Sequence, residues 1–412
     1  MIDFELSEDM RVMRDMINQV ALQTMRPISH QFDEEEHTDP VEWQKMMWDV
    51  SKGSSVFGGG PSDKKERGGS NGKPVERNVG ATVTIEELSW GDAGLYLSIP
   101  NPGLGGAAVS AAGTPEQKKR FLQRFSEGEP KWAAMAITEP GFGSDSAAVA
   151  TTATRDGDHW VLNGTKIFCT SGQRALDKSE GFVVVWATVD KSAGRAGIKA
   201  FVVDHGTPGV TVTKVEDKLG IRCSDTAAIV LEDARIPLDN ILGDAEVQTD
   251  SQKGFKGVMA TFDATRPAVA ASAIGIGRAA VDFVRDELAK AGVEIRYDRP
   301  PMKQTAIERD FMAMEAHLQA ARLLTWRAAW MMDRGMRNSL EASMCKSKAG
   351  LAVTQVTQKA VEILGPLGYS RKLLLEKWMR DAKINDIFEG TQQINLMIVA
   401  RRILDYTSRE LN

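Results

Sequence analysis

Apolar residues recur at helical spacing in the first part of the chain. They are Met10, Met13 and Ile17, and the pattern returns at Val83, Ile85 and Leu88. Ser7 precedes two acidic residues and is a good N-cap, because its hydroxyl can accept a hydrogen bond from an unpaired helical N–H group. A further helical pattern runs from Gln117 to Phe125. We therefore expect residues 1–134 to form an α-helical N-terminal domain.

The pattern changes to short β-branched runs between residues 135 and 243. Two runs, Thr151–Arg155 and His159–Phe168, flank the turn Asp156-Gly157-Asp158 and predict a hairpin. Four further runs are Phe182–Thr188, Ile198–Val203, Val210–Val215 and Ala227–Leu231. Because no helical pattern separates these strands, they predict an antiparallel β-sandwich or β-barrel domain.

Four long amphipathic segments fill residues 244–412 and predict a four-helix bundle. The first runs from about residue 262 to 290, and the last from about Gln392 to Tyr406. Between them lie a segment with Phe311, Met314 and Leu318 on one face and another that stops at Gly365-Pro366. The predicted fold is therefore α+β and mostly α, with a helical domain, an antiparallel β domain and a C-terminal bundle.

A glycine-rich stretch interrupts the first helical part at residues 51–80. It contains Gly58-Gly59-Gly60-Pro61 and the charged run Lys64-Lys65-Glu66-Arg67, which are typical of a mobile surface loop. A phosphate-binding loop is disfavoured, because no strand precedes these glycines and no Gly-Lys-Ser/Thr follows them.

Composition excludes several classes of protein. The chain has 412 residues, enough for two or three domains, and its formal net charge of −5 argues against a nucleic-acid partner. The three cysteines, Cys169, Cys223 and Cys345, have no metal-ligand spacing, so we predict buried thiols in a reducing compartment and no metal site. The first residues lack a basic and apolar leader, and we expect no stretch to be apolar for long enough to span a bilayer. These features predict a soluble, cytoplasmic protein.

A carboxylate near the end of the chain is a candidate general base. Glu389 follows the apolar pair Ile387-Phe388 and precedes Gly390, which allows the backbone to approach a ligand closely. A carboxylate in an apolar setting has a raised pKa and suits proton abstraction. The alternative is an ordinary acidic residue at a helix entry.

Five segments, in order along the chain, resemble those of the acyl-CoA dehydrogenase family. They are Ala136–Asp145 (AITEPGFGSD), Leu162–Gly172 (LNGTKIFCTSG), Lys218–Thr226 (KLGIRCSDT), Phe262–Pro267 (FDATRP) and the stretch around Glu389. The resemblance implies the three-domain fold predicted above. It also implies bound FAD, an acyl-CoA substrate in fatty acid metabolism, an electron-transfer flavoprotein as acceptor, and a homotetramer or homodimer whose neighbour completes each site.

The resemblance implies oxidation of an acyl-CoA thioester to the 2,3-enoyl-CoA. In this reaction a base removes the α-proton while the β-hydride passes to flavin N5, and Glu389 matches the family's common base position. The Glu389 backbone N–H and a flavin ribityl hydroxyl would then stabilise the enolate oxygen. Some members instead carry the base at the position of Thr265, which cannot serve as a base here.

Other roles carry over from the same resemblance. The residues that match flavin contacts are Thr138, Gly143, Ser144, Phe168, Thr170, Thr391 and Gln393, and Gly141 lies in the same loop. Those that match the substrate or the mouth of its site are Ser144, Asp263, Arg266, Phe388 and Gly390. Phe168 stands where the family usually has Trp stacked on the flavin, and a buried strand aromatic is the alternative. Arg266 has an alternative as a salt-bridge partner at a helix start.

Two departures from the family pattern affect contacts between subunits. An arginine that normally reaches the neighbour's FAD could be either Arg296 or Arg299. A glutamine that normally faces the neighbour is Glu362, and a carboxylate there would be costly beside a diphosphate unless it were protonated or turned away.

The sequence leaves two alternatives to a dehydrogenase. The same fold could serve a flavin oxidase or monooxygenase that reacts with dioxygen. It could also serve as a non-catalytic partner subunit, although the presence of Glu389 disfavours this.

Overall fold

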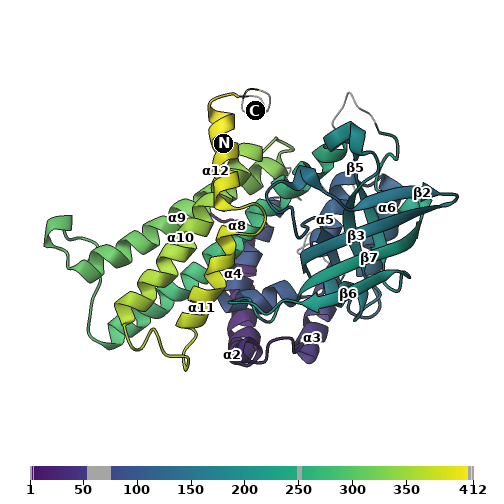
Figure 1. The fold of residues 1–412 in the computed structure, drawn as a ribbon. Helices are drawn as coiled ribbons and strands as arrows, with labels where there is room; N and C mark the ends of the chain where they lie inside the picture. The colour runs from purple at the N-terminus through teal and green to yellow at the C-terminus, as the bar shows by residue number, and fades with distance from the viewer. Residues whose placement is uncertain (1, 3, 53–75, 248–252, 407–409, 411–412) are drawn as a thin grey trace.

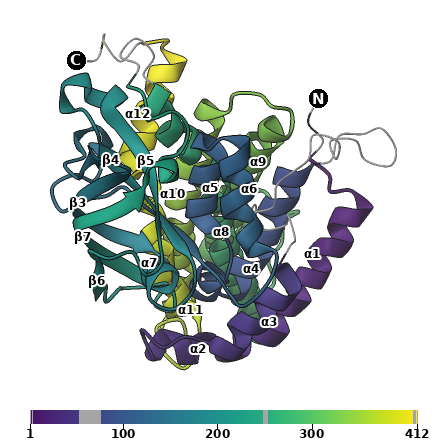
Figure 2. The ribbon, with the colours of Figure 1, turned by 90° about the vertical axis from the view of Figure 1, so that its right-hand side faces the viewer.

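The computed structural model describes residues 2, 4–52, 76–247, 253–406 and 410. The C-terminal helices and the β domain lie side by side, and the N-terminal helices lie against both (Figure 1). After a quarter turn, α5 and α6 are seen against the sheet, with α1–α3 along another side of the molecule (Figure 2). The order of elements matches the predicted fold class.

The N-terminal part is helical, as predicted. Its helices are α1 (Glu8–Val20), α2 (Arg26–Glu34), α3 (Val41–Ser51), α4 (Arg77–Ser98), α5 (Gly103–Ala112) and α6 (Pro115–Leu122). The Ser7 hydroxyl accepts a hydrogen bond from the Met10 N–H, which confirms the predicted cap. Most of the predicted surface loop, residues 53–75, lies outside the described residues, and its last predicted residues instead begin α4.

Seven strands form one sheet in the order β1-β4-β2-β3-β7-β6, with β5 also paired to β4. They are β1 (Ala133–Ala136), β2 (Thr152–Asp156), β3 (His159–Thr170), β4 (Phe182–Thr188), β5 (Ile198–Asp204), β6 (Val210–Val215) and β7 (Thr226–Pro237). The β2–β3 hairpin is antiparallel, as predicted. Pairing is antiparallel except that β4 runs parallel to β1 and its last residue, Thr188, pairs in parallel with Thr152 at the start of β2.

The sequence pattern missed β1 and the second half of β7. Strand β1 reads Ala-Ala-Met-Ala, which has neither the β-branched residues nor the alternation that signal a strand. It forms because its small side chains fit between β4 and α5, and all four residues are buried. In β7 the exposed residues Glu232 and Asp233 interrupt the apolar run after Leu231, so the prediction ended too early.

Strands β4 and β5 are buried on both faces, and this attaches the β domain to the helices. Val183 and Val185 face the apolar core inside the β domain. Val184 and Trp186 instead face a second cluster shared with α5, α6 and the start of α8. Burial on both faces explains why these strands read as continuous apolar runs.

The C-terminal part is a helical bundle, as predicted. It contains α8 (Lys253–Lys290), α9 (Ala306–Asp333), α10 (Ser339–Leu364), α11 (Leu375–Ala382) and α12 (Gln392–Ile403). Gly365, with φ of 55°, ends α10 where the glycine predicted a stop. The pattern missed α11, because eight residues give too few turns to show a period.

One expectation about hydrophobicity is wrong. Among the described residues, the part of α8 from residue 257 to 290 is long and apolar enough to cross a membrane by length and composition alone. Most of its apolar window is buried inside the protein, where α8 packs against α4, α9 and α10. A central core helix meets the same criterion as a membrane span because it is apolar on nearly all sides.

A buried ion network on α11 joins the three parts of the chain. The Lys377 ammonium lies 2.7 Å from Asp92 of α4 and 2.6 Å from Asp381 of α11. Asp381 also accepts a hydrogen bond of 2.5 Å from the backbone N–H of Ile221, in the loop before β7. Ile221 has φ of 47°, which is strained for a β-branched residue, so these contacts must hold the loop in place.

We predict that Lys377→Met destabilises the protein strongly. It leaves two buried carboxylates without their shared cation, which costs about 3–5 kcal/mol in comparable sites. Chemical denaturation followed by circular dichroism would measure the loss. Lys372→Met, at an exposed position shortly before the same helix, is the matched control and should change stability little. Equal stability of the two variants would contradict a structural role for the network.

Candidate active site

Glu389 lies in a left-handed turn between the 3-10 turn Lys383–Asp386 and α12. Its φ is 55° and that of Gly390 is 87°. Glycine adopts this conformation without strain, whereas a glutamate there costs of order 1–3 kcal/mol. A strained backbone at Glu389, between two regular elements, indicates that contacts with the surrounding residues hold this turn in place.

Side-chain donors hold the backbone carbonyls of this turn. Arg266 of α8 donates its Nε–H to the Glu389 carbonyl at 3.4 Å, and Lys346 of α10 donates to the Gly390 carbonyl at 2.7 Å. Asn395 of α12 donates to the Gly390 carbonyl at 2.8 Å and to the Thr391 carbonyl at 3.0 Å. Three helices therefore fix consecutive carbonyls of the turn, which we name the base loop (residues 387–391).

The backbone N–H groups of the base loop are available to a ligand. Within the described part of the chain, the N–H groups of Glu389, Gly390 and Thr391 have no hydrogen-bond acceptor. The Thr391 hydroxyl caps α12 by accepting from the Ile394 N–H at 3.3 Å. Unpaired N–H groups at a helix start suit an oxyanion or a phosphate.

The Glu389 carboxylate is close to cations but forms no ion pair with any described residue. Its Oε2 accepts a hydrogen bond of 2.8 Å from the Thr265 hydroxyl of α8. Burial raises the pKa of Glu389, against the opposing effects of Thr265, Arg266 and Lys346. The two positions that the resemblance named for a base are therefore in direct contact, with the acid at one and a hydroxyl donor at the other.

Asp263 and Arg266 support the base loop from inside α8. Arg266 is buried, and its guanidinium lies 3.2 Å from the Asp263 carboxylate and 3.3 Å from the Ser343 hydroxyl. The predicted salt bridge thus exists, but it lies well inside α8 rather than at its start. Asp263 in turn accepts a hydrogen bond from Ser339 of α10.

The loop after β1 presents open space at its glycines. A Cβ atom added to Gly141 or Gly143 would meet nothing within 4 Å, and Ser144 beside them is exposed. The Thr138 carbonyl accepts the Ile167 N–H at 2.9 Å, which ties this loop to β3. These positions of the loop are therefore open, and no neighbouring group blocks the approach of a ligand to them.

Phe168 is 58% exposed, so its alternative as a buried strand aromatic is wrong. It has φ of 57° and lies in an irregular part of β3 where the pairing with β7 shifts register. A bulge of this kind redirects a side chain out of the sheet. Thr170, two residues further on, is half-buried, and Gln393 on α12 is exposed.

A buried ion pair, Glu139 and Lys166, stabilises the loop after β1 from its interior side. The sequence analysis gave these two residues no role. The Lys166 ammonium lies 2.7 Å from the Glu139 carboxylate, and both side chains are almost completely buried. Glu139 also accepts from the Thr151 N–H at 2.9 Å and the Ala150 N–H at 2.7 Å. The available signal was the alternation along β3, which places Lys166 on the same side as the buried Trp160 and Leu162. A charge at such a position requires a buried partner.

Models of three acyl-CoA dehydrogenase domains match the chain. The N-terminal domain matches residues 7–129, the middle domain residues 134–234 and the C-terminal domain residues 252–404. The chain is 37% identical over 402 residues to the short-chain specific acyl-CoA dehydrogenase of Bos taurus mitochondria, covering 97% of this chain and 91% of the relative.

The chain belongs to the acyl-CoA dehydrogenase family.

Solved structures agree with this assignment. Butyryl-CoA dehydrogenase from Megasphaera elsdenii superposes with a TM-score of 0.83 at 32% identity, covering 98% of this chain and 100% of that one. A chain from a structure of the electron-transferring flavoprotein of Acidaminococcus fermentans gives a TM-score of 0.82 at 32% identity, with the same coverage. The protein is therefore an acyl-CoA dehydrogenase oxidoreductase, and its family implies a flavin cofactor.

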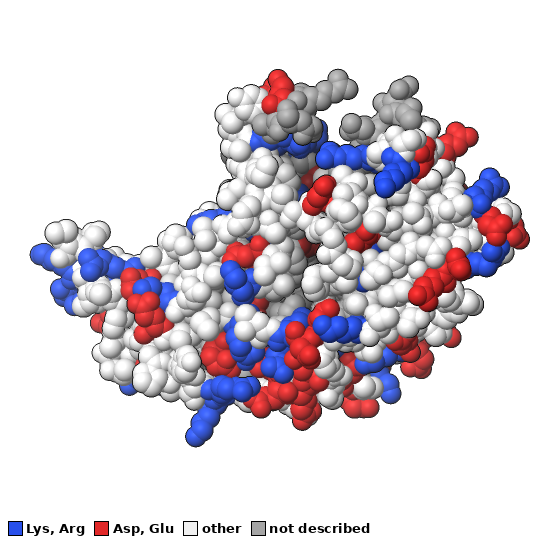
Figure 3. Space-filling model, in the orientation of Figure 1, with Lys and Arg blue, Asp and Glu red and all other residues white. Residues whose placement is uncertain are grey.

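The residues present fit such a cofactor. Phe168 offers an exposed ring, the Gly141–Gly143 loop offers space, and the base loop offers unpaired N–H groups. Phe168 and the glycine loop belong to the β domain, and the base loop belongs to the bundle. The face in Figure 3 is hollowed where these two parts meet. Charges of both signs are interspersed over this face, with wide uncharged areas between them.

The structure separates the two arginines proposed to reach a neighbouring acyl-CoA dehydrogenase subunit. Arg296 is held by Glu308 through contacts of 2.6 and 2.8 Å. Arg299 is exposed, and its side chain forms no hydrogen bond or ion pair with another described residue. Arg299 is thus the better candidate to reach another subunit. Glu362 is exposed and pairs with Lys359 at 2.8 Å, which directs its charge toward its own chain.

We predict that Glu139→Gln weakens the loop in a pH-dependent way. Burial alone would raise the pKa of Glu139, but hydrogen bonds from Lys166 and Thr151 hold it below its ordinary value. Its stabilisation is therefore present above the ordinary carboxyl pKa and is lost as the pH falls through the depressed one. At pH 7 the variant should lose about 3–5 kcal/mol, because Lys166 stays buried without its partner.

Thermal unfolding of wild type and Glu139→Gln between pH 7 and pH 3 would measure this difference, which should shrink in acid. Glu129→Gln, at an exposed position, is the control. A difference that stays constant over this range would show that the ionised carboxylate is not the stabilising group.

Proposed function

We propose that this protein oxidises an acyl-CoA to its 2,3-enoyl-CoA with Glu389 as the base that removes the α-proton. The observation that supports this is the placement of Glu389. It is a carboxylate with a raised pKa, bonded to Thr265 and flanked by cations that bind backbone carbonyls instead of the carboxylate. A base of this kind keeps its lone pairs available and is basic enough to accept a weakly acidic proton.

The base loop would also stabilise the charge that develops on the substrate. When the α-proton leaves, negative charge moves onto the thioester oxygen. The unpaired N–H of Glu389 is suited to donate to that oxygen, because its own backbone is held rigidly by Arg266 and Lys346. Phe388 and Gly390, on either side of the base, would line the slot for the acyl chain.

We propose FAD as the flavin. When bound, FAD supplies the acceptor for the β-hydride. Phe168, Thr170 and Thr138 would hold its ring, and Ser144 and Gly143 its diphosphate. Thr391 and Gln393, at the start of α12, would bind the diphosphate and adenosine side. Asp263 and Arg266 would then lie between the base loop and the mouth of the site.

The names of the relatives suggest substrate and partner. We propose a short, straight acyl-CoA as substrate and an electron-transfer flavoprotein as acceptor. We also propose a homodimer or homotetramer in which Arg299 reaches the neighbour, and a cytoplasmic location for a protein whose three cysteines are free and buried.

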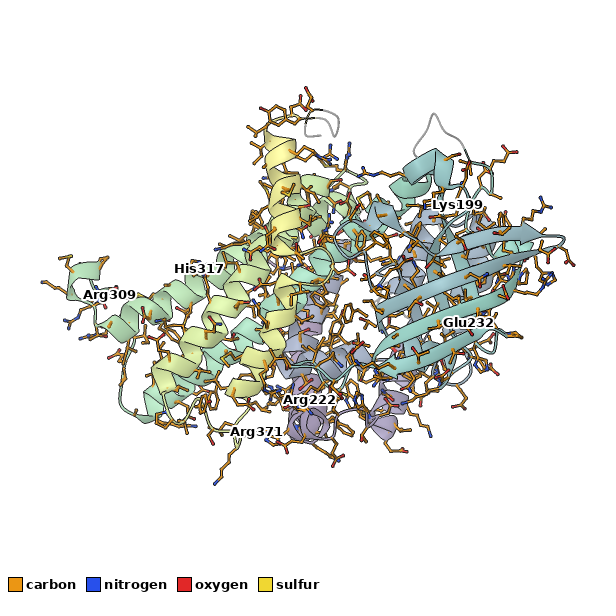
Figure 4. All side chains as sticks on the ribbon, in the orientation of Figure 1. Lys199, Arg222, Glu232, Arg309, His317 and Arg371 are labelled. Atoms are coloured by element: carbon orange, nitrogen blue, oxygen red, sulfur yellow. The ribbon has the colours of Figure 1, made fainter. Side chains whose placement is uncertain are left out.

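We predict that Glu389→Gln binds FAD but loses flavin reduction by at least about 1,000-fold, because the amide cannot take a proton. Anaerobic stopped-flow absorbance with butyryl-CoA would follow flavin bleaching. The control is Glu232→Gln, at an exposed position on β7 (Figure 4). Butyryl-CoA should reduce the flavin of this variant at the wild-type rate. Reduction of Glu389→Gln at the wild-type rate would refute the assignment.

We predict slow reaction of the reduced protein with dioxygen and fast reaction with an electron-transfer flavoprotein. Wild-type protein reduced by butyryl-CoA would be mixed with air-saturated buffer or with the flavoprotein, and both peroxide formation and reoxidation would be recorded. Stoichiometric peroxide at a rate that matches turnover would instead indicate the flavin oxidase. A wild-type protein that no acyl-CoA in a panel of chain lengths reduces would support a non-catalytic subunit.

A further inference from the structure

One stripe of α10 faces the base loop and the 3-10 turn before it. Lys346, Gly350 and Thr354 are spaced four residues apart, so they lie on the same side of the helix. Lys346 donates to the Gly390 carbonyl, and Thr354 lies 3.2 Å from the Asp386 carboxylate. A Cβ atom on Gly350 would lie 2.6 Å from the Asn385 carbonyl. Helix α10 therefore contacts the segment 385–390 at both of its ends, through Gly350 and Thr354 at residues 385–386 and through Lys346 at Gly390.

Lys346 is unusual within this stripe because it places a charge in a dry setting. Only 1% of the residue is exposed, and the Gly390 carbonyl at 2.7 Å is the one described acceptor of its three N–H groups. A buried ammonium with a single neutral acceptor is costly. Packing alone does not account for such a residue, since methionine would fill the same volume without that cost.

The charged groups around Lys346 come from the loop and from α8. Burial lowers the pKa of Lys346 to about 8; Glu389 and Asp386 oppose this shift by favouring the protonated form, and Arg266 adds to it. Neither carboxylate forms an ion pair with it, since Asp386 pairs with Lys383 at 3.0 Å and Glu389 bonds to Thr265. The ammonium therefore acts on Glu389 through space and through the Gly390 carbonyl.

We propose that Lys346 is a positioning residue of the reaction, which fixes the left-handed Glu389–Gly390 turn and keeps a positive charge beside the site of proton abstraction. This inference rests on the proposed function. With the Gly390 carbonyl anchored, the Glu389 side chain and N–H keep one orientation toward the substrate. The buried charge also stabilises the ionised base before the proton moves and the enolate afterwards.

Three variants test the proposal in the FAD-loaded protein. Lys346→Met removes the charge and the donor, Lys346→Arg keeps both, and Lys348→Met makes the same change at the next lysine of α10. Lys348 contacts His317 of α9 at 3.0 Å. Because successive helical residues are about 100° apart, Lys348 lies on nearly the opposite side of α10 from Lys346. We expect Lys346→Met to slow flavin reduction by butyryl-CoA about 10- to 100-fold with KM within twofold. Lys346→Arg should recover most of the rate, and Lys348→Met should match wild type.

The pH profile separates an electrostatic role from a merely structural one. Reduction needs ionised Glu389, so the rate should rise with pH through the pKa of this residue. Removing the nearby positive charge raises that pKa further, so the rising limb should move to higher pH in Lys346→Met and return toward its wild-type position in Lys346→Arg. A slow Lys346→Met variant with an unmoved limb would overturn the electrostatic part of the proposal.

Amide hydrogen exchange provides a readout that does not depend on catalysis. The peptide from residue 384 to 395 contains bonded N–H groups of Ile387, Phe388 and Asn395. Their exchange should be about 10-fold faster in Lys346→Met than in Lys348→Met. If no acyl-CoA reduces the flavin of the wild-type protein, the proposed function fails. The exchange measurement still tests whether Lys346 holds the loop in position. Equal exchange and equal reduction rates in the two methionine variants would overturn the proposal.

Discussion

The site depends on two buried cations that bind carbonyl oxygens instead of the carboxylate beside them. Arg266 holds the Glu389 carbonyl and Lys346 the Gly390 carbonyl. A direct ion pair would lower the pKa of Glu389 and occupy its lone pairs. Because the cations are engaged elsewhere, burial dominates and raises the pKa of the carboxylate. The same contacts offset the strain of a left-handed glutamate.

This arrangement requires the three parts of the chain to keep fixed positions relative to one another. Helix α11 is joined to the base loop by the 3-10 turn Lys383–Asp386. Its buried ion network reaches α4 through Asp92 and the β domain through the Ile221 N–H. Arg380 adds a 2.6 Å contact to Asp33 of α2. The helix that precedes the base is thus fixed to the domain that carries Phe168 and Thr170. A shift between domains would separate the base from the proposed flavin site.

Local pattern predicted the elements whose burial matches their periodicity. The long bundle helices, the β2–β3 hairpin and the Ser7 cap were found where expected. Elements that exist only through their neighbours were missed, namely β1 and α11. The apolar length of α8 was underestimated from the sequence, although an interior helix can be as long and as apolar as a membrane span.

The sequence by itself determined which residue types occupy the candidate site, because Glu389, Thr265 and the glycine-containing loop follow from short motifs. Only the tertiary structure decided which side chains meet. It brought Thr265 to the Glu389 carboxylate, Lys346 to the Gly390 carbonyl and Lys166 to Glu139. These partners are 27 to 124 residues apart in the chain. Periodicity encodes which face of an element is buried but not which distant group lies opposite a charge, so their pairing is a property of packing.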